Sequence, residues 1–560
     1  MKKKRLLLFY LFIYFSTYFS IFSQDIVFEY KNIPLKNQKG EILRLGSAGG
    51  FNSPQIYSID LDLDSKEDLV IFDRSNYRFL TFLAKNNQYE YAPQFEKIFP
   101  TCQGWIVLID VDNDGLKDIF TNNFFLGVSI YKQKKIENKV KFDLFIEEIQ
   151  TKKTDILYTL NIPLTDIPAI VDIDNDGDLD IITFEYWQGK NIELHENITP
   201  KNNKEKLLFK QKTSCWANLH EGLECGEFYF ENCEKPKGKG GGEVLFSGLT
   251  KDAHAGSTIH LFDVNGDKKL DILIGDAACQ NLYVFLNEGN NQKPKFKKMT
   301  TNFPISKPIQ TFNFPAIFFL DVDFDAKIDM LVAPNLFISK NNKVNFSKSL
   351  HFYKNTGSNQ KPNYQFICDN FLQNEMIDIG ENAKVRFEKD SLMVEPKTGD
   401  ELVENDGKIS QIFFEDFDGD GEIDSLLVHK KGFITCQNKI LIQNLGQNPF
   451  ITLKDYNQDK KLDIFIGTSG GGVQYYENTS KNWQLQTELS TDKKMIKVRN
   501  KTNGRLFLKK INHQQIYVNI FINAQQFTPI DISDVPEGKY EWILEKENGI
   551  KLIDFWEFKK

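Results

Sequence analysis

Acidic side chains recur in this chain at a spacing that suits a hard metal ion. The pattern Asp-x-Asp/Asn-x-Asp-x-x-x-Asp occurs seven times, and a hydrophobic run follows each copy. Oxygen ligands at alternate positions of a tight loop can point at one centre, and Ca²⁺ takes about six to eight oxygens. Without a cation, carboxylates this close together repel one another and raise each other's pKa. The sequence therefore predicts a repeated calcium unit, with up to seven Ca²⁺ ions per chain.

The predicted ligands are the side chains at positions 1, 3, 5 and 9 of the loops, which are numbered loop 1 to loop 7 in chain order. They are Asp60, Asp62, Asp64 and Asp68; Asp110, Asp112, Asp114 and Asp118; Asp172, Asp174, Asp176 and Asp180; Asp263, Asn265, Asp267 and Asp271; Asp321, Asp323, Asp325 and Asp329; Asp416, Asp418, Asp420 and Asp424; and Asp455, Asn457, Asp459 and Asp463. Glycine, which turns without strain, stands at position 6 only in loops 2, 3 and 6, as Gly115, Gly177 and Gly421. Weaker binding is expected in the other loops. The alternative is a set of acidic surface turns, which Asp and Gly also favour.

The residues around each loop exclude an EF-hand and indicate strands. An EF-hand needs Glu at position 12 and a helix on each side, whereas position 12 here carries Ile, Thr, Val or Leu. Short β-branched and aromatic runs follow position 9, as at 69–72 and 181–184, and apolar runs precede position 1. An aromatic strand that ends in Asn comes next, as at 281–287 and 473–478.

Four short strands per repeat predict a propeller blade, so the fold class expected is all-β. The seven loops predict a seven-bladed β-propeller over residues 24–482. Two long intervals between loops, 180–263 and 329–416, are expected to carry insertions on the rim.

The segment from Gly256 through Asp263 and Gly275-Asp276 to Asn287-Glu-Gly289 resembles the FG-GAP/VCBS repeat. This is the integrin-alpha-type propeller, in the form common in secreted bacterial proteins, and the resemblance extends over residues 50 to 480. It implies that the side chains at positions 1, 3, 5 and 9 bind Ca²⁺.

The N-terminus predicts export. Residues 1–23 have a basic start, an apolar stretch and a small residue before the expected cut, as in a secretory signal peptide. A membrane anchor is the alternative, but no later run is long enough to span a bilayer. Losing four positive charges takes the formal charge from −8 to −12, and seven Ca²⁺ would bring it to about +2. We therefore expect an extracellular or outer-membrane surface protein that binds no nucleic acid.

The seven cysteines fit an oxidising compartment. Three of them, Cys215, Cys225 and Cys233, lie close together, which predicts a local disulfide. A zinc site is the alternative, although the CxxC spacing is missing. The odd total leaves at least one thiol unpaired within the chain.

Residues 490–560 differ from the repeats, because the acidic loops stop and apolar residues alternate with polar ones. A small C-terminal β-sandwich is expected. The segment Asp531-Ile-Ser-x-x-Pro-x-Gly-x-Tyr540 is similar to the C-terminal sorting domain of the Bacteroidetes type IX secretion system, which would make the secretion machinery a partner. An immunoglobulin-like accessory domain is the alternative.

Catalytic motifs are weak, so the chain is not expected to be an enzyme. Gly467-Thr-Ser469-Gly-Gly471 fits a nucleophile elbow, but a strand rather than a helix is expected after it. His260 lies in a strand-like run and is interpreted as structural. The predicted function is an adhesion or binding module for a surface protein or glycan. The alternatives are a secreted enzyme that acts on a polysaccharide or phosphodiester and a structural spacer.

Overall fold

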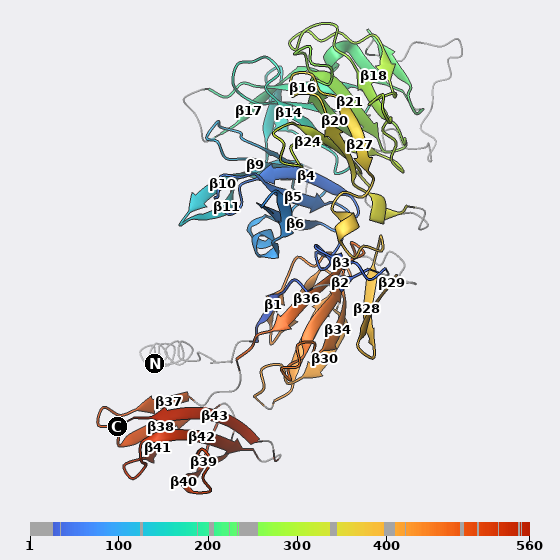
Figure 1. The fold of residues 1–560 in the computed structure, drawn as a ribbon. Helices are drawn as coiled ribbons and strands as arrows, with labels where there is room; N and C mark the ends of the chain where they lie inside the picture. Colours follow the sequence, from blue (N-terminus) through green and yellow to red (C-terminus); the bar gives the residue numbers. More distant parts are fainter. Residues whose placement is uncertain are drawn as a thin grey trace, which may run out of the picture.

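The computed structural model shows an all-β chain built mostly from four-stranded antiparallel sheets (Figure 1). It describes residues 26–559 except 34, 38, 124–126, 187–188, 201–205, 223, 232, 234–255, 337–343, 397–408, 421, 482–485, 501–502, 525, 547–548 and 550. The predicted signal peptide lies outside the described residues. Within the part described, no helix is long and apolar enough to cross a membrane.

Five consecutive units, from residue 54 to residue 368, carry loops 1 to 5 between their first and second strands. Their strands are β4 (Pro54–Ile59), β5 (Asp68–Asp73), β6 (Arg78–Lys85) and β7 (Gln88–Tyr91); β8 (Ile106–Ile109), β9 (Asp118–Asn122), β10 (Val128–Ile136) and β11 (Lys139–Ile146); β14 (Ala169–Val171), β15 (Asp180–Phe184), β16 (Ile192–Asn197) and β17 (Leu208–Thr213); β20 (Ser257–Phe262), β21 (Asp271–Asp276), β22 (Leu282–Phe285) and β23 (Met299–Thr300); and β24 (Pro315–Leu320), β25 (Asp329–Pro334), β26 (His351–Asn355) and β27 (Tyr364–Cys368). The third sheet gains two strands, β12 (Gln150–Lys153) and β13 (Ile156–Thr159).

These five sheets form a closed ring. Their first strands, β4, β8, β14, β20 and β24, line one largely apolar cavity of about 240 Å³. Hydrogen bonds join neighbouring sheets, as where the Thr258 hydroxyl donates to the Pro315 carbonyl at 2.9 Å. The fifth sheet meets the first, where Gln55 Nε2 donates to Asn335 Oδ1 at 3.2 Å. A propeller-like arrangement is therefore present in the first two-thirds of the chain.

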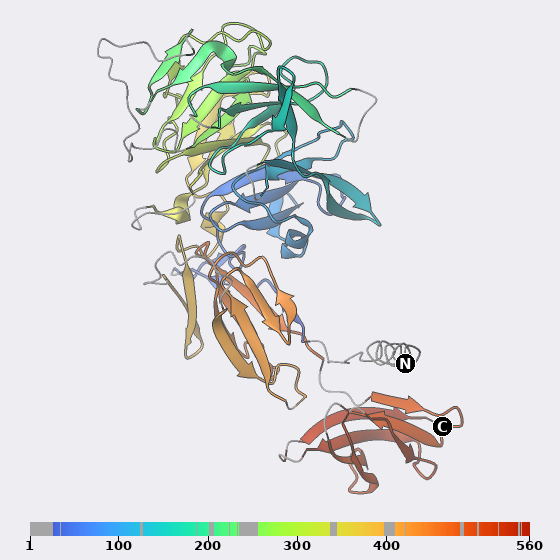
Figure 2. The same cartoon turned by 180° about the vertical axis from the view of Figure 1, so that it is seen from behind.

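Two further four-stranded sheets carry loops 6 and 7 and lie outside this ring, beside its first sheet (Figures 1 and 2). One contains β30 (Ile409–Glu415), β31 (Asp424–His429), β32 (Phe433–Cys436) and β33 (Lys439–Ile442). The other contains β34 (Phe450–Lys454), β35 (Asp463–Gly467), β36 (Val473–Asn478) and β1 (Phe28–Tyr30) from the start of the chain. Asn52 Nδ2 donates to the Ser469 carbonyl at 3.2 Å, and Gln474 Nε2 donates to the Tyr91 hydroxyl at 2.7 Å.

The predicted single ring of seven blades is therefore not confirmed. All seven acidic-loop units form sheets, but only five of them surround the cavity. The physical reason is that β24 already packs against β4, as where the Tyr57 and Phe318 rings meet at 5.8 Å. No opening remains between those strands for two more sheets.

Each of the two long intervals, where insertions on the rim were expected, contains an additional hairpin. The first contains β18 (Leu219–Glu221) and β19 (Phe228–Phe230), and the second contains β28 (Ala383–Glu388) and β29 (Ser391–Pro396). The described residues of this part also contain a two-stranded sheet of β2 (Leu35–Lys36) and β3 (Ile42–Leu43). They also contain the 3-10 turns η1 (Pro93–Ile98), η2 (Trp216–Asn218), η4 (Phe346–Lys348) and η5 (Gln373–Glu375).

The C-terminal unit consists of two sheets that share one core. One sheet contains β37 (Gln486–Leu489), β38 (Met495–Arg499) and β41 (Thr528–Asp531). The other contains, in spatial order, β40 (Ile516–Ile522), β39 (Gly504–Lys510), β42 (Gly538–Glu545) and β43 (Lys551–Phe558). Tyr540 and Trp542 are fully buried between them with Val498 and Ile530. The unit touches loop 6, because the buried Lys546 ammonium donates to the Asp420 carbonyl at 2.5 Å.

Candidate metal centres

The position-1 carboxylate folds each acidic loop around itself. In loop 1, Asp60 Oδ1 accepts from the Asp64 amide and Asp60 Oδ2 from the Ser65 amide, both at 3.0 Å. The position-5 carboxylate then accepts the amide of position 7 in all seven loops. These local bonds hold the loop tight before any cation binds, so the ligand oxygens are largely preorganised.

The position-9 aspartate ties the loop to the sheet. In loop 2, Asp118 Oδ2 accepts from the Val111 amide at 3.1 Å, and Oδ1 accepts from the Gln133 amide of the third strand at 2.8 Å. Equivalent pairs occur in the other loops, except that in loop 6 Gln437 Nε2 replaces the strand amide. Position 9 is therefore a structural clamp as well as a candidate ligand, a role that the spacing alone did not reveal.

The position-9 carboxyl is partly buried, so its pKa depends on the groups around it. Desolvation raises the pKa of this carboxyl to about 6 at Asp68, Asp118, Asp180, Asp271 and Asp329, although the amide hydrogen bonds oppose the shift. A nearby cation would counter this cost, because an opposite charge favours the ionised form.

Carboxylates converge as the spacing predicts. In loops 1, 2, 3 and 5, one oxygen from each of three aspartates lies within 4.8 Å of the others. The sets are Asp60, Asp62 and Asp68; Asp110, Asp112 and Asp118; Asp172, Asp174 and Asp180; and Asp321, Asp323 and Asp325.

Orphaned oxygen atoms show that these residues fit a cation. The Oδ1 atoms of Asp62, Asp112 and Asp323, all at position 3, are buried and have no hydrogen-bond partner among the described residues. Asp455 Oδ1, at position 1 of loop 7, is in the same situation. A buried acceptor without a partner costs about 1–3 kcal/mol, and more when it is charged. An oxygen-seeking ion such as Ca²⁺ would supply the missing interaction.

Among the described residues, lysine side chains from outside the loop neutralise part of the charge in loops 1, 2 and 5. Lys85 lies 2.5 Å from Asp62 Oδ2, Lys132 lies 2.5 Å from Asp112 Oδ2, and Lys354 pairs with Asp323. Lys85 also contacts Asp64 in loop 1, and Lys354 also contacts Asp325 in loop 5. These contacts lower the pKa of Asp64 and Asp325.

Loops 3 and 7 have glutamate where loops 2 and 5 have lysine. Glu196 precedes Asn197, and Glu477 precedes Asn478, just as Lys132 precedes Gln133 in loop 2. Glu477 Oε1 accepts from Asn457 Nδ2 at 3.0 Å. In loop 3, burial and then the charge of Asp176 raise the pKa of Asp174, and Glu196 adds to this effect. Loops 2 and 3, which the sequence ranks together, thus differ in charge.

The backbone supports the glycine argument at position 6 and extends it to position 4. Position 6 has positive φ in every described case: 70° at Ser65, 84° at Gly115, 94° at Gly177, 64° at Lys268, 63° at Ala326 and 72° at Lys460. Gly421 lies outside the described residues. Position 4 is also left-handed: 62° at Leu63, 58° at Asn113, 60° at Asn175, 82° at Gly266, 65° at Phe324, 70° at Gly419 and 64° at Gln458. Asn or Gly stands at position 4 in four loops, as Asn113, Asn175, Gly266 and Gly419. This recurrence is the sequence signal that could have revealed the left-handed backbone there.

The structure places the remaining sequence candidates in strands and in the turn between two strands. Residues 467–471 end β35 and turn into β36, so the nucleophile-elbow pattern lacks its helix. Burial lowers the pKa of His260 to about 4, and its ring packs 5.1 Å from that of Phe319.

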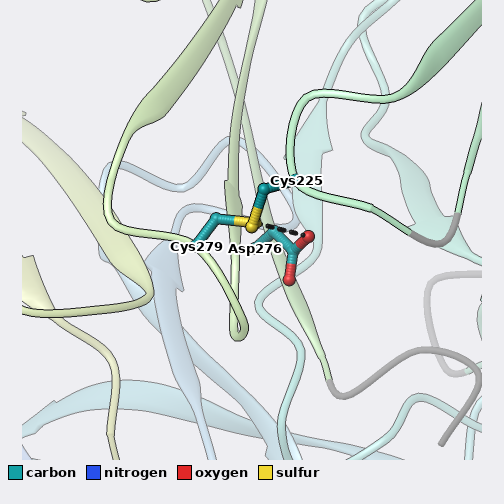
Figure 3. Close-up of side chains that lie close together, drawn as sticks. All are labelled: Cys225, Asp276 and Cys279. Atoms are coloured by element: carbon teal, nitrogen blue, oxygen red, sulfur yellow. Dashed lines mark hydrogen bonds between the residues drawn. A yellow bond between two sulfur atoms is a disulfide. The ribbon is translucent and has the colours of Figure 1, made fainter. Parts of the chain in front are cut away.

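The predicted local disulfide joins Cys215 to Cys233. A second disulfide, which was not foreseen, joins Cys225 to Cys279 beside Asp276 (Figure 3). These two sulfurs are bonded to each other, so the three side chains do not form a metal site as they stand. Cys102, Cys368 and Cys436 are free. Two disulfides suit an extracellular protein.

Comparison with known proteins supports the repeat. The model of the FG-GAP-like repeat matches residues 263–332, which run from loop 4 to the strand after loop 5. A search of curated proteins finds no similar sequence. Among solved structures, a similar chain is described as "Crystal structure of BBS1N in complex with ARL6DN, soaked with mercury", with 10% identity, a TM-score of 0.23, and coverage of 82% of this chain and 99% of that chain.

The positive φ at position 6 predicts that Lys460→Gly stabilises loop 7 by about 1 kcal/mol, because a side chain in this conformation costs about 1–2 kcal/mol. Urea unfolding in EDTA measures the effect. Lys460→Ala, which removes the charge but keeps Cβ, should show no such gain.

Gly177→Ala, at the same position of loop 3, is the matched opposite change. A Cβ there meets nothing within 4 Å, so only the 94° φ opposes it. It should lose a similar free energy of unfolding. A gain of stability in Gly177→Ala, or no change in either variant, would contradict the strain argument.

Loops 2 and 3 allow a matched test of charge. Both read Asp-x-Asp-Asn-Asp-Gly, but Asp112 pairs with Lys132, whereas among the described residues no lysine forms an ion pair with Asp174. We predict that Asp174→Ala removes more of the calcium-dependent rise in melting temperature than Asp112→Ala. Calorimetric Ca²⁺ titration of both variants gives the affinities directly. Equal losses, or a larger loss in loop 2, would refute this ranking.

Proposed function

We propose that this protein is a secreted or cell-surface, calcium-loaded propeller protein that binds another molecule, either a surface protein or a glycan. The single observation that supports it most is the recurrence of the acidic loop in seven sheets, with converging oxygens and orphaned acceptors in loops 1, 2 and 5. Such loops stiffen a scaffold, and a rigid scaffold with variable connecting segments suits recognition.

The proposed calcium ligands are the residues at positions 1, 3, 5 and 9. The ion would supply charge compensation, while the chain's own amides at positions 5, 6 and 7 orient the carboxylates. All seven units are proposed to bind the ion, most weakly where lysine is already present. The two outer units are proposed to act as blades attached beside the ring.

The C-terminal unit is proposed to be the β-sandwich that directs export. Its segment from Asp531 to Tyr540 forms a compact turn, in which the Tyr540 hydroxyl donates to the Pro536 carbonyl at 2.6 Å. The similarity of this segment to a type IX sorting signal and the two disulfides support passage to the cell surface.

The character of the cavities favours binding over catalysis. The central cavity is lined mainly by aliphatic side chains with Lys117 and His260. The larger cleft contains one carboxyl, Glu96, whose pKa burial raises to about 7. Its Oε1 accepts from the Tyr91 hydroxyl at 2.6 Å and lies 3.7 Å from Arg78. Glycoside hydrolysis commonly uses two carboxyl groups across the scissile bond, and neither described cavity presents such a pair.

Arrays of surface proteins and oligosaccharides, probed with the purified chain, test the proposal. We expect retention of a partner in millimolar Ca²⁺ and weaker retention after EDTA, because the loops position the connecting segments. Cleavage of the arrayed sugars or of a phosphodiester substrate would instead identify an enzyme. A chain that retains no partner in either condition would be a structural spacer.

A further inference from the structure

A deep cleft separates the ring from the sheet β30–β33. Its volume is about 460 Å³, and its walls come from the β5–β6 turn, from residues 96–103 and from residues 431–433 and 443–447. The cleft exists because the sixth sheet lies beside the ring instead of within it. This volume is in the usual range of small-ligand sites, which span about 300–1,000 Å³.

Amide side chains dominate the polar lining of the cleft. Gln103, Gln443, Asn444 and Gln447 all line it, and their side chains make no hydrogen bond to another described residue. Gln103 and Gln447 are half-buried, and Gln443 and Asn444 are exposed, so all four amides are accessible to a ligand in the cleft. Each amide has two N–H donors and an acceptor oxygen. Adjacent sugar hydroxyls also donate and accept, so they match this lining.

An aromatic ring stands at the same wall. Tyr77 lines the cleft with 44% of its surface exposed. Its φ of 51° is unusual for a residue with a side chain, and such strain persists only where the surroundings impose it. The turn before it is firmly held, because Asp73 Oδ1 accepts from the Ser75 hydroxyl at 2.9 Å and the Asp73 carbonyl accepts from the Asn76 amide at 3.1 Å. The backbone that carries the ring is therefore held in place at the wall of the cleft.

The charge of the lining points to a neutral ligand. Glu96 lies at the base of the cleft, where it is bonded to Tyr91 and close to Arg78. Lys431 is the exposed charged residue among those that line it. One exposed cation does not make the basic patch that a sulfated or uronic polymer would need.

We propose that this cleft binds a neutral carbohydrate, with Tyr77 stacking on a sugar face and the four amides contacting its hydroxyls. This inference rests on the proposed binding function and assigns it a ligand class and a place. Aromatic rings supply large contact area at low cost in conformational entropy, and the amides supply orientation.

The probe is a set of neutral oligosaccharides of glucose, galactose, mannose, xylose and N-acetylglucosamine, tested against the calcium-loaded chain by calorimetry. Tyr77→Gly removes the ring and suits the positive φ, so this variant should fold. Gln447→Ala removes one amide. Each should weaken binding at least tenfold, whereas Phe555→Ala, which removes a 72% exposed ring from the C-terminal unit, should leave it unchanged.

The outcomes separate this inference from the proposed function. Unchanged affinity in Tyr77→Gly and Gln447→Ala, or an equal loss in Phe555→Ala, would place binding elsewhere and overturn the cleft assignment. Binding of the wild-type chain to proteins or anionic sugars but to no neutral oligosaccharide would also overturn it, while leaving the binding function intact. If the wild-type chain binds no protein, no anionic sugar and no neutral oligosaccharide, the cleft assignment and the proposed binding function both fail.

Discussion

The constraint on which the structure depends is the compensation of clustered negative charge. Every repeat brings aspartates together at the turn between its first two strands, and like charges in a partly buried place are costly. Backbone amides donate hydrogen bonds to the carboxylates at positions 1, 5 and 9. Lysine side chains pair with the position-3 carboxylates of loops 1, 2 and 5. Buried oxygens without a partner among the described residues remain, as at Asp62, and they are the places where the proposed cation would compensate the charge.

The same clamp links metal binding to the fold. Position 9 accepts one amide hydrogen bond from the loop and another from the third strand, so this candidate ligand also helps to fix how the loop sits on the sheet. Loops with different net charge then offer different affinities within one scaffold. Loop 6 has a further link, since Lys546 of the C-terminal unit contacts it directly.

Much of the local structure could be predicted from the sequence, because it follows from short-range patterns. The strands on either side of each loop, the turn at 467–472 and the Cys215–Cys233 disulfide all depend on neighbouring residues. The closure of the ring could not be predicted, since it depends on how β24 meets β4 across about 260 residues. The lysine partners were hidden because Lys85, Lys132 and Lys354 lie well beyond their loops along the chain. The cleft beside Tyr77 likewise brings together residues that are far apart in sequence.

Thermal unfolding of the intact chain with and without Ca²⁺ tests the central claim most directly. Extracellular sites of this ligand class bind at roughly 10⁻⁴–10⁻³ M. At about 10 mM Ca²⁺, a site with a dissociation constant of about 1 mM adds about 1.4 kcal/mol by mass action. Several such sites should raise the melting temperature by several degrees over the EDTA sample, and Mg²⁺ at equal concentration should do less. Identical melting curves in Ca²⁺ and EDTA would contradict the account.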